Sequence, residues 1–319
     1  MNPKRERSGG CQRRVRRDRA TQVRLLPDTL RRVFVLTWNI HAIVGAGQDR
    51  RHAIVARLAE REPDIVLLQE VGNEVARHLL PELEACGFAA FFGGVEGAAE
   101  KKYGNVIASR TPLRPVQVGW AKAPWPQLLT RASVTVDGRE IDVISAHMPN
   151  GSGNGWKKIE TFEALAAALA ASPSMPRIVG GDFNEPQAIL ASGEVVSFGA
   201  KQNRDGTYCL EGNKRSPRSP RPGIVVESHP RKRWNDGVKS ILGSDAPHGL
   251  RHIHHAVHGF ENTPVTHLVR NQLRFFDHLL VSSDFVVEDA GFFDEWRKAK
   301  LSDHSAAWGR VALDRLVTA

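Results

Sequence analysis

Short apolar runs rich in β-branched residues constrain the fold of this chain more than any other feature. Such runs are typical of strands buried on both sides of a sheet. They are VFVLTWNI (33–40), DIVLLQE (64–70), NVIASR (105–110), RIVGGDFN (177–184), FFDHLLVS (275–282) and AAWGRVAL (306–313). Helical patterns lie in between, at 52–62, 75–86 and 158–171. Because Asp137-Gly138 also predicts a hairpin within 132–146, strands are joined both by helices and by a hairpin, which indicates a mixed-sheet α/β domain.

The composition is that of an ordinary globular protein, with 41% hydrophobic and 25% charged residues in a chain of 319. No linker rich in glycine, serine or proline divides residues 33–315, so we expect one domain there. We find no apolar run long enough to span a membrane and expect no secretory signal. Three cysteines without C-x-x-C spacing favour neither a disulfide framework nor a zinc site, and we therefore expect a cytoplasmic protein.

The net charge of +9 is concentrated at the N-terminus. Residues 1–32 contain eleven lysines and arginines but only three acidic residues, which leaves the rest of the chain nearly neutral. We expect this segment to be a disordered basic tail, which either has no role or holds a polyanion without sequence specificity. A second stretch rich in proline and arginine, residues 212–236, predicts an exposed basic insertion.

Polar side chains mark five of the predicted strands, mostly at their ends. They are Asn39, Glu70, His147, Asp182 with Asn184, and Asp277 with His278. A single polar residue at a strand end is most often a helix cap or a turn residue. Five together indicate a functional site, because α/β proteins tend to place their chemistry where strands end.

The residue types in this set predict phosphate chemistry. Carboxylate and amide oxygens, without cysteines or histidines at zinc-site spacing, suit Mg²⁺ or Mn²⁺ better than zinc. Nearby histidines such as His147 and His304 can stabilise charge on a phosphate or move a proton near neutral pH. With Asp303 as a further carboxylate, the set indicates hydrolysis of a phosphate ester by an activated water.

The order of these motifs resembles the endonuclease/exonuclease/phosphatase superfamily. The motifs are TWN (37–39), LQE (68–70), GN-x-x-x-SR (104–110), H-x-P-N (147–150), GDFN (181–184), the Asp-His pair at 277–278 and SDH (302–304). GDFN or SDH alone is a weak signal, but the ordered set is specific and spans roughly residues 33–313. The resemblance implies a DNase I-like fold, which is a four-layer sandwich of two mixed β-sheets flanked by helices.

The resemblance also implies how a metal ion and a water would be held. Glu70 would bind the metal directly, with Asn39 and Asp303 in or just outside its ligand shell. Asp182 and Asn184 would position the attacking water and the scissile phosphate. The implied cofactor is Mg²⁺ or Mn²⁺, in agreement with the preference of oxygen ligands for these ions.

The same resemblance assigns roles to the histidines. His304 would be the catalytic histidine, oriented by Asp277 through its other ring nitrogen. His147 would contact the phosphate or the leaving oxygen, and Asn150 would help to hold the phosphate. The sequence leaves open whether Asp182 or His304 takes the proton from the water.

Two departures from the superfamily pattern narrow the substrate. The exonuclease III-like and abasic-site enzymes carry a tyrosine where this chain has His147, whereas the DNase I, lipid-phosphodiesterase and phosphatase branches use two histidines. An arginine is also frequent two residues before the Asp277 position, where this chain has Phe275, with Arg274 one place earlier. These differences argue against abasic-site specificity and leave phosphodiester hydrolysis as the expectation.

A glycine-rich loop, NGSGNGWKK (150–158), precedes a predicted helix. Its backbone amides, with Lys157 and Lys158, are expected to bind phosphate, and the alternative is a surface loop with a solvated lysine pair. Arg270, just before the 275–282 strand, is a further candidate for a phosphate contact.

The remaining histidines and tryptophans are interpreted as structural. The six histidines at 248–267 match no tetrahedral zinc spacing, and we expect a partly exposed helix there. His41 and His278, which adjoin motifs, are expected to support the site or the core. Four tryptophans are also expected to pack in the protein interior, and the alternative is that they stack on nucleic-acid bases. They are Trp120, Trp125, Trp156 and Trp234.

The sequence therefore predicts a Mg²⁺-dependent phosphodiester hydrolase, in the first place a nuclease that cleaves DNA or RNA. A phosphatase or phosphodiesterase for a small-molecule or lipid phosphate is the enzymatic alternative, because the body of the chain is nearly neutral. A binding protein that has lost its chemistry is the third, and it conflicts with the complete set of motif residues. Nucleic acid is the expected partner, and no obligate protein partner is inferred.

Overall fold

The computed structural model describes residues 31–42, 47–94, 102–117, 120, 123–171, 175–214, 229–261, 263–269 and 272–313. Nearly all of the basic segment 1–32 lies outside these residues, as do most of the stretch 212–236 and Arg270.

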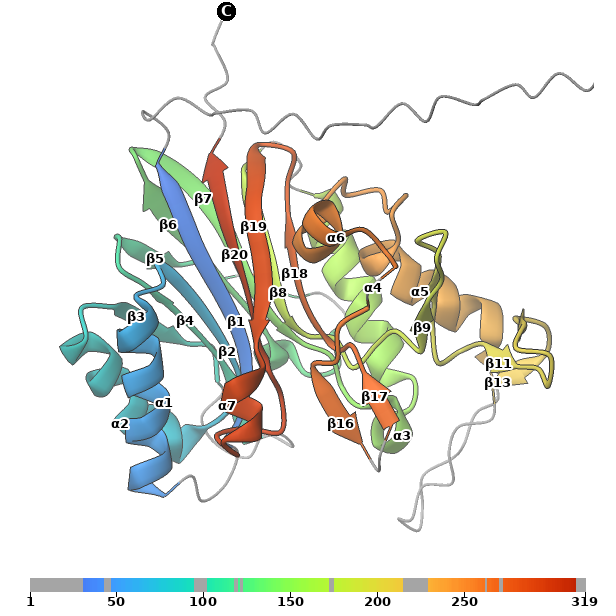
Figure 1. Cartoon of the computed structure of the whole chain (residues 1–319), viewed down its shortest axis with the longest axis horizontal. Coiled ribbons are helices and arrows are strands. Elements are labelled where there is room, and N and C mark those ends of the chain that lie inside the picture. Colours follow the sequence, from blue (N-terminus) through green and yellow to red (C-terminus); the bar gives the residue numbers. More distant parts are fainter. Residues whose placement is uncertain are drawn as a thin grey trace, which may run out of the picture.

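Two mixed six-stranded sheets form the centre of the molecule (Figure 1). The order in the first sheet is β19 (Phe285–Phe293), β20 (Ala306–Leu313), β1 (Arg32–Ala42), β2 (Ile65–Gly72), β4 (Tyr103–Ser109) and β3 (Ala89–Phe92). The order in the second is β15 (Arg251–His252), β18 (Asp277–Val281), β8 (Arg177–Asp182), β7 (Arg139–His147), β6 (Leu129–Val136) and β5 (Leu113–Pro115). Among the described strands, β1–β2 and β7–β8 pair in parallel, and each of these two connections contains a long helix, α1 or α4.

Helices cover the outer face of each sheet, so the molecule has four layers. Figure 1 shows α1 (Gln48–Arg61) and α2 (Asn73–Ala85) on one side, and α4 (Lys157–Ala170) and α5 (Arg231–Leu242) on the other. The predicted DNase I-like sandwich is confirmed in this arrangement. None of the described helices combines the length and the apolar character needed to cross a membrane.

Strand β1 is apolar on both faces because each face packs against a different core. Val33 and Val35 face the core between the two sheets, whereas Phe34, Leu36 and Trp38 face the core beneath α1 and α2. Since side chains alternate along a strand, a strand with helices on one face and a sheet on the other buries every residue. A third core lies between the second sheet and α4 and α5.

The hairpin between β6 and β7 forms at the predicted turn. Asp137 and Gly138 both have positive φ, 49° and 78°, as a type I′ turn requires. The two strands pair without interruption from Val136–Arg139 to Leu129–Ala146. This pairing carries β7 to its end at His147.

Two predictions about the second half of the chain were wrong. The basic stretch 212–236 is not all loop, because α5 begins at Arg231 and buries Trp234. The segment 248–267 is not one helix: α6 (Ile253–His258) is a short helix between β15 and the strand β16 (His267–Val269). Strand β16 forms a two-stranded hairpin with β17 (Gln272–Arg274).

The other described elements are short. They are η1 (Pro126–Leu128), α3 (Gly151–Asn154), β9 (Ala188–Ile189), β10 (Val195–Val196), β11 (Lys201–Gln202), β12 (Tyr208–Cys209), β13 (Asn213–Lys214), β14 (His229–Pro230) and α7 (Asp294–Lys298).

Candidate active site

Strands from both sheets bring the predicted polar residues together. In the second sheet, His147 of β7 pairs with Asp182 of β8, and Asp182 pairs with Asp277 of β18. Because residues opposite each other on neighbouring strands share a face, these three side chains stand in a row. The first sheet contributes Asn39 and Glu70, which lie near the ends of β1 and β2.

Asp182 is the centre of this arrangement. Its carboxylate is buried and accepts hydrogen bonds from Asn39 Nδ2 at 2.9 Å, from Asn184 N at 2.8 Å and from Asn184 Nδ2 at 3.2 Å. Asn184 adopts a left-handed backbone conformation with φ 51°, and its amide also donates to the Met148 carbonyl. Asp182 is therefore fixed by three N–H donors from two residues, Asn39 and Asn184.

Two imidazoles face the same oxygen of Asp182. His147 Nε2 lies 3.7 Å and His304 Nε2 lies 3.8 Å from Asp182 Oδ2. His147 Nε2 is also 3.4 Å from Glu70 Oε1. The structure thus brings together the two histidines and the two carboxylates that the sequence singled out.

The orientation of His304 is set by Asp277. Nδ1 of His304 donates to Asp277 Oδ2 at 2.9 Å, and both side chains are buried. Burial acts to lower the pKa of His304, but the Asp277 and Asp182 carboxylates outweigh it and raise the pKa to about 10. The backbone amide of Asp277 donates to Thr266 Oγ1 at 3.2 Å. His304 is therefore held as an imidazolium whose Nε2 points at the site.

Glu70 is kept ionised by its surroundings. Burial acts to raise its pKa, but a hydrogen bond from His41 and the nearby His147 and His304 lower the pKa to about 2. Its backbone has φ 56°, a strained value for a residue other than glycine. The result is a charged carboxylate at the end of β2 that still has partial access to solvent.

Asp303 lies at the rim of the site beside two further histidines. His267 Nε2 is 3.3 Å from Asp303 Oδ2, and His41 Nδ1 is 3.8 Å from Asp303 Oδ1. Burial acts to raise the pKa of Asp303, but His267, His304 and His41 hold it below its usual range. The His267 ring also stacks on the His304 ring, with centroids 4.0 Å apart and planes 9° apart.

Three residues at the site were not predicted to act in it. His267 was included with the structural histidines, and His41 was expected only to support its surroundings. Tyr103, whose ring centroid lies 5.7 Å from that of His147, was not considered. Burial and the charges of Glu70 and Asp182 raise the pKa of Tyr103 above its usual range, so its hydroxyl stays protonated. Its place directly before the GN-x-x-x-SR segment was the available signal.

The predicted phosphate-binding residues occupy different places. Asn150 caps the short helix α3, with Oδ1 accepting from Ser152 N at 2.8 Å. Lys157 Nζ lies 4.3 Å from the centre of the Trp125 ring. Arg270 is outside the described residues.

Lys158 differs from the expectation of a surface phosphate ligand. Its side chain is 2% exposed, and Nζ lies 2.9 Å from Glu185 Oε1 and donates to the Asn184 carbonyl at 2.6 Å. Burial lowers its pKa, and Glu185 opposes this effect. The structure therefore places Lys158 beneath the loop that carries Asn184, where it supports the site from within.

The donor set fits a divalent cation. Ligand atoms of Glu70, His147 and Asp182 all lie within 4.8 Å of one another, and so do those of Asp182, Asp277 and His304. Ionised carboxylates beside imidazoles are donors that divalent ions bind. Asn39 is less available as a metal ligand. Its Nδ2 donates a hydrogen bond to Asp182, and its Oδ1 accepts one from the His41 backbone amide at 3.0 Å.

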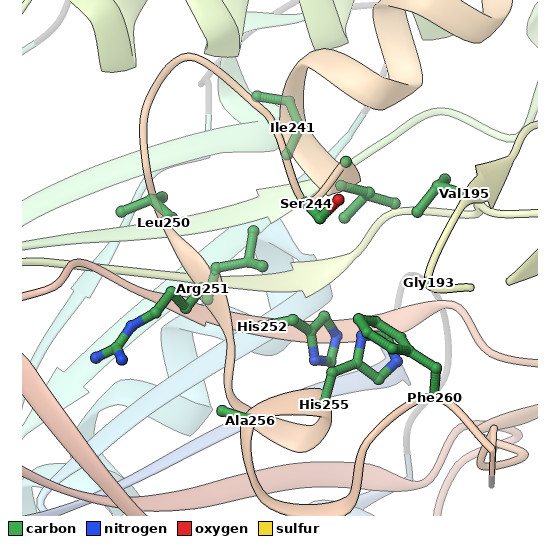
Figure 2. Close-up of a pocket in the computed structure, with 13 residues that line it drawn as sticks. Gly193, Val195, Ile241, Ser244, Leu250, Arg251, His252, His255, Ala256 and Phe260 are labelled. Carbon is green, nitrogen blue, oxygen red and sulfur yellow. The ribbon is translucent and has the colours of Figure 1, made fainter. Parts of the chain in front are cut away.

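A separate pocket of about 240 Å³ lies away from this site (Figure 2). Figure 2 shows His252, His255 and Phe260 along one side and Val195, Ile241 and Leu250 around the rest. His252 Nε2 is 2.8 Å from His278 Nδ1, and His278 Nε2 is 2.8 Å from the Glu185 carbonyl. His252 and His278 are thus packed against the core, whereas His255 lies on the short, partly exposed helix α6. None of the predicted site residues lines this pocket.

The fold and this constellation define a hydrolytic phosphoesterase. The model of the endonuclease/exonuclease/phosphatase family matches residues 36–304, and the chain belongs to that family. No curated protein matches the sequence.

Solved structures share the fold at low sequence identity. An AP endonuclease from Archaeoglobus fulgidus has a TM-score of 0.60 and 20% identity, over 87% of this chain and 98% of that one. The 3′ phosphatase NExo from Neisseria, bound to a product DNA hairpin, has a TM-score of 0.57 and 18% identity, over 87% and 98%. D. rerio TDP2 complexed with single-strand DNA product has a TM-score of 0.58 and 13% identity, over 88% and 98%.

Proposed function

We propose that this protein is a Mg²⁺- or Mn²⁺-dependent phosphodiester hydrolase that cleaves nucleic acid by in-line attack of a water. The observation that carries the proposal is that His147 Nε2 and His304 Nε2 lie 3.7 Å and 3.8 Å from the same oxygen of Asp182, beside the ionised Glu70. A carboxylate between two imidazole donors provides a proton acceptor and two hydrogen-bond donors within one small space.

Asp182 is the proposed general base. Its carboxylate is held by Asn39 and Asn184, so it has a fixed position from which to accept a proton from the attacking water. His304, with Nδ1 bonded to Asp277, presents Nε2–H to a non-bridging phosphate oxygen and stabilises the charge that develops there.

His147 is placed to act on the leaving oxygen. It is buried at the end of β7, next to Glu70 and opposite Asp182 in the sheet. From this position its ring can donate a hydrogen bond to the oxygen whose bond to phosphorus breaks. When a divalent cation is bound by Glu70, with Asp303 and Asn39 nearby, Lewis-acid stabilisation of the phosphate charge is added.

Nucleic acid is the proposed substrate class for two reasons. The similar folds include proteins described as bound to a DNA hairpin and to single-strand DNA product. Residues 1–32 carry most of the net positive charge, and a basic segment favours binding of a polyanion.

We further propose that residues 33–315 form one catalytic domain, with 1–32 as a tail. The family match over residues 36–304 supports this proposal. The free Cys86 and Cys209 are compatible with the proposed cytoplasmic location.

The test is a substrate panel with one matched pair of variants. Wild type, Glu70→Gln and Glu74→Gln are assayed with Mg²⁺ on single- and double-stranded DNA, on RNA, on an abasic-site duplex and on bis-(p-nitrophenyl) phosphate. Glu74 is a suitable control because its side chain is 78% exposed on α2, outside the site. We expect Glu70→Gln to reduce cleavage of a polynucleotide by at least about 100-fold and Glu74→Gln to leave it unchanged.

The other outcomes separate the alternatives. If only the small ester is cleaved, and its cleavage still depends on Glu70, the site is correct but the substrate is a small-molecule or lipid phosphate instead of nucleic acid. Activity that survives Glu70→Gln would refute the site. A folded wild type without activity on any substrate would favour the binding protein.

A further inference from the structure

The ring of His267 covers one face of the His304 ring. The two ring centroids lie 4.0 Å apart and the ring planes differ by 9°, so the rings are stacked almost parallel. A further ring, that of Phe276, lies with its centroid 5.7 Å from that of His267. His304 is therefore held by a flat ring against its face, in addition to the Asp277 carboxylate at Nδ1.

The backbone beside His267 is joined to the segment that carries His304. His267 and His304 form an antiparallel β-bridge, and the Ser305 amide donates to the Thr266 carbonyl at 2.8 Å. Thr266 is buried, and its Oγ1 accepts from the backbone amide of Asp277 at 3.2 Å. The stack is thus fixed by the backbone as well as by the rings, and the same segment contacts the residue that orients His304.

Core packing does not explain why the hairpin that carries His267 lies beside the site. Figure 1 shows β16 and β17 as a small hairpin outside the two six-stranded sheets. Its paired residues Leu268 and Leu273 are 46% and 66% exposed, although both are large and apolar. The contacts of His267, in contrast, link the hairpin directly to the catalytic residues.

His267 makes two contacts that could each serve the site. Its ring stacks on His304, and its Nε2 lies 3.3 Å from Asp303 Oδ2, where it donates because a carboxylate only accepts. The hydrogen bond is long, and the Asp303 side chain is 47% exposed. The stacked side chains of His267 and His304 are only 15% and 5% exposed. The stack is therefore the stronger constraint of the two.

We propose that His267 is a positioning residue, whose ring fixes the plane of His304 so that Nε2 of His304 faces the phosphate. This inference rests on the proposed function, in which His304 Nε2–H stabilises charge on a phosphate oxygen. The bond from Nδ1 to Asp277 limits the position of the ring but leaves its plane free to tilt. A donor stabilises developing charge only when it is aimed correctly, so loss of the stack slows the chemical step more than it weakens substrate binding.

Two substitutions separate the ring of His267 from its hydrogen bond. His267→Phe keeps a flat ring against His304 and loses the N–H, whereas His267→Gln keeps an amide donor for Asp303 and loses the ring. His52→Gln, at a histidine of α1 that is 51% exposed, is the control. Values of kcat and KM are measured with Mg²⁺ on bis-(p-nitrophenyl) phosphate and on labelled single-stranded DNA, at equal folded fraction.

The expected result is a change in kcat that follows the ring. We expect His267→Gln to lower kcat about 10- to 100-fold while KM stays within about threefold of wild type. His267→Phe should keep both constants within about threefold, and His52→Gln should change neither. The proposal is overturned if His267→Gln retains the wild-type kcat, or if His267→Phe loses as much as His267→Gln.

The ring protons of His304 report the stack without an activity assay. In wild type and in His267→Phe these protons lie over an aromatic ring, so their NMR signals are expected upfield of those in His267→Gln. Identical His304 signals in all three proteins would overturn the proposal. A wild type inactive on both substrates would overturn the proposed function and the catalytic role of His267 with it. That result is distinguishable, because the NMR signals would still report the stack.

Discussion

Lys158 is a charged residue inside the protein, and its environment decides what it contributes. The ammonium group contacts Glu185, which also accepts from Trp234 Nε1 at 3.0 Å and from the Phe198 amide at 2.9 Å. Removal of the lysine leaves the Glu185 carboxylate buried without its counter-charge, and such a loss is costly.

We therefore predict that Lys158→Met reduces the free energy of unfolding by about 3–5 kcal/mol in urea titrations. The double variant Lys158→Met/Glu185→Gln should recover part of this loss, because the isolated charge is gone. If Lys158→Met instead leaves the free energy of unfolding unchanged and raises KM at least about tenfold, Lys158 is a direct phosphate ligand.

The Asp277–His304 pair gives a second prediction for a single residue. Asp277→Asn keeps the shape of the side chain but removes the charge that holds the His304 imidazolium. We expect kcat on bis-(p-nitrophenyl) phosphate to fall by about 10²- to 10⁴-fold. Asp284→Asn, at an aspartate that accepts from Ser282 Oγ outside the site, serves as the control. A kcat within threefold of wild type would show that His304 needs no carboxylate partner.

Single residues near the site were predictable when they lay within a motif. Glu70, His147, Asp182 and His304 follow from their positions at strand ends and from the motif order. His267 does not, because its contacts with Asp303 and His304 depend on a hairpin whose folding back is not encoded in local spacing. His41 directly follows the predicted strand 33–40, but its contacts require the end of another strand and a distant loop.

At the scale of elements, the approach of β7 and β8 determines where the site residues stand. A Cβ added to Gly181 would lie 1.7 Å from the Ala146 carbonyl oxygen, so only glycine allows the two backbones to come this close. The parallel pairing of Ala146 with Gly181 immediately precedes that of His147 with Asp182. Gly181, the glycine of the GDFN motif, is thus part of the geometry of the site.

We predict that Gly181→Ala lowers the free energy of unfolding by about 3 kcal/mol or more and reduces activity in the fraction that remains folded. Gly153→Ala is the matched control, because no atom lies within 4 Å of its added Cβ. Chemical denaturation and kcat are measured for both variants. Equal stability of the two variants would mean that β7 and β8 do not approach as described.

Helices and strands were predictable where they are long enough to show a clear hydrophobic periodicity in the sequence. Strand β20 has the predicted bounds, and α4 differs from its prediction by one residue at each end. The first residues of helix α5 were assigned to the exposed basic insertion 212–236. The run Arg231, Lys232 and Arg233 is polar, and the apolar face of the helix becomes clear only with Trp234 and Val238. Helix α6 is too short for a periodic signal, and its histidines suggested a different structure.

For the whole molecule, the two sheets create the site by facing each other. Glu70 and Asn39 come from the first sheet, whereas His147, Asp182 and Asp277 come from the second. Strand order within each sheet and the stacking of the sheets are long-range properties, which local sequence patterns do not contain. The motif order supplied them through the family resemblance, and the family match confirms that inference.

The histidines behind the second sheet predict how the stability of the whole molecule depends on pH. Burial lowers the pKa of His255 to about 4 and that of His278 to about 3, below the usual 6.5. Between these values and 6.5 the unfolded chain binds protons that the folded chain does not, so stability falls as the pH decreases from 7 to 5. His255→Phe should show a smaller fall in unfolding free energy over this range. An equal or larger fall in the variant would contradict the assigned neutral state of His255.

We propose that Asp182, held by amides and close to two imidazoles, is the acceptor around which phosphodiester hydrolysis is organised. The most direct test is the rate of cleavage of a labelled DNA or RNA strand by wild type and by Asp182→Asn, in the presence of Mg²⁺ and at equal folded fraction. We predict that the variant binds the strand but cleaves it at least about 10³-fold more slowly. Cleavage at the wild-type rate would contradict the central role of Asp182 and the site built around it.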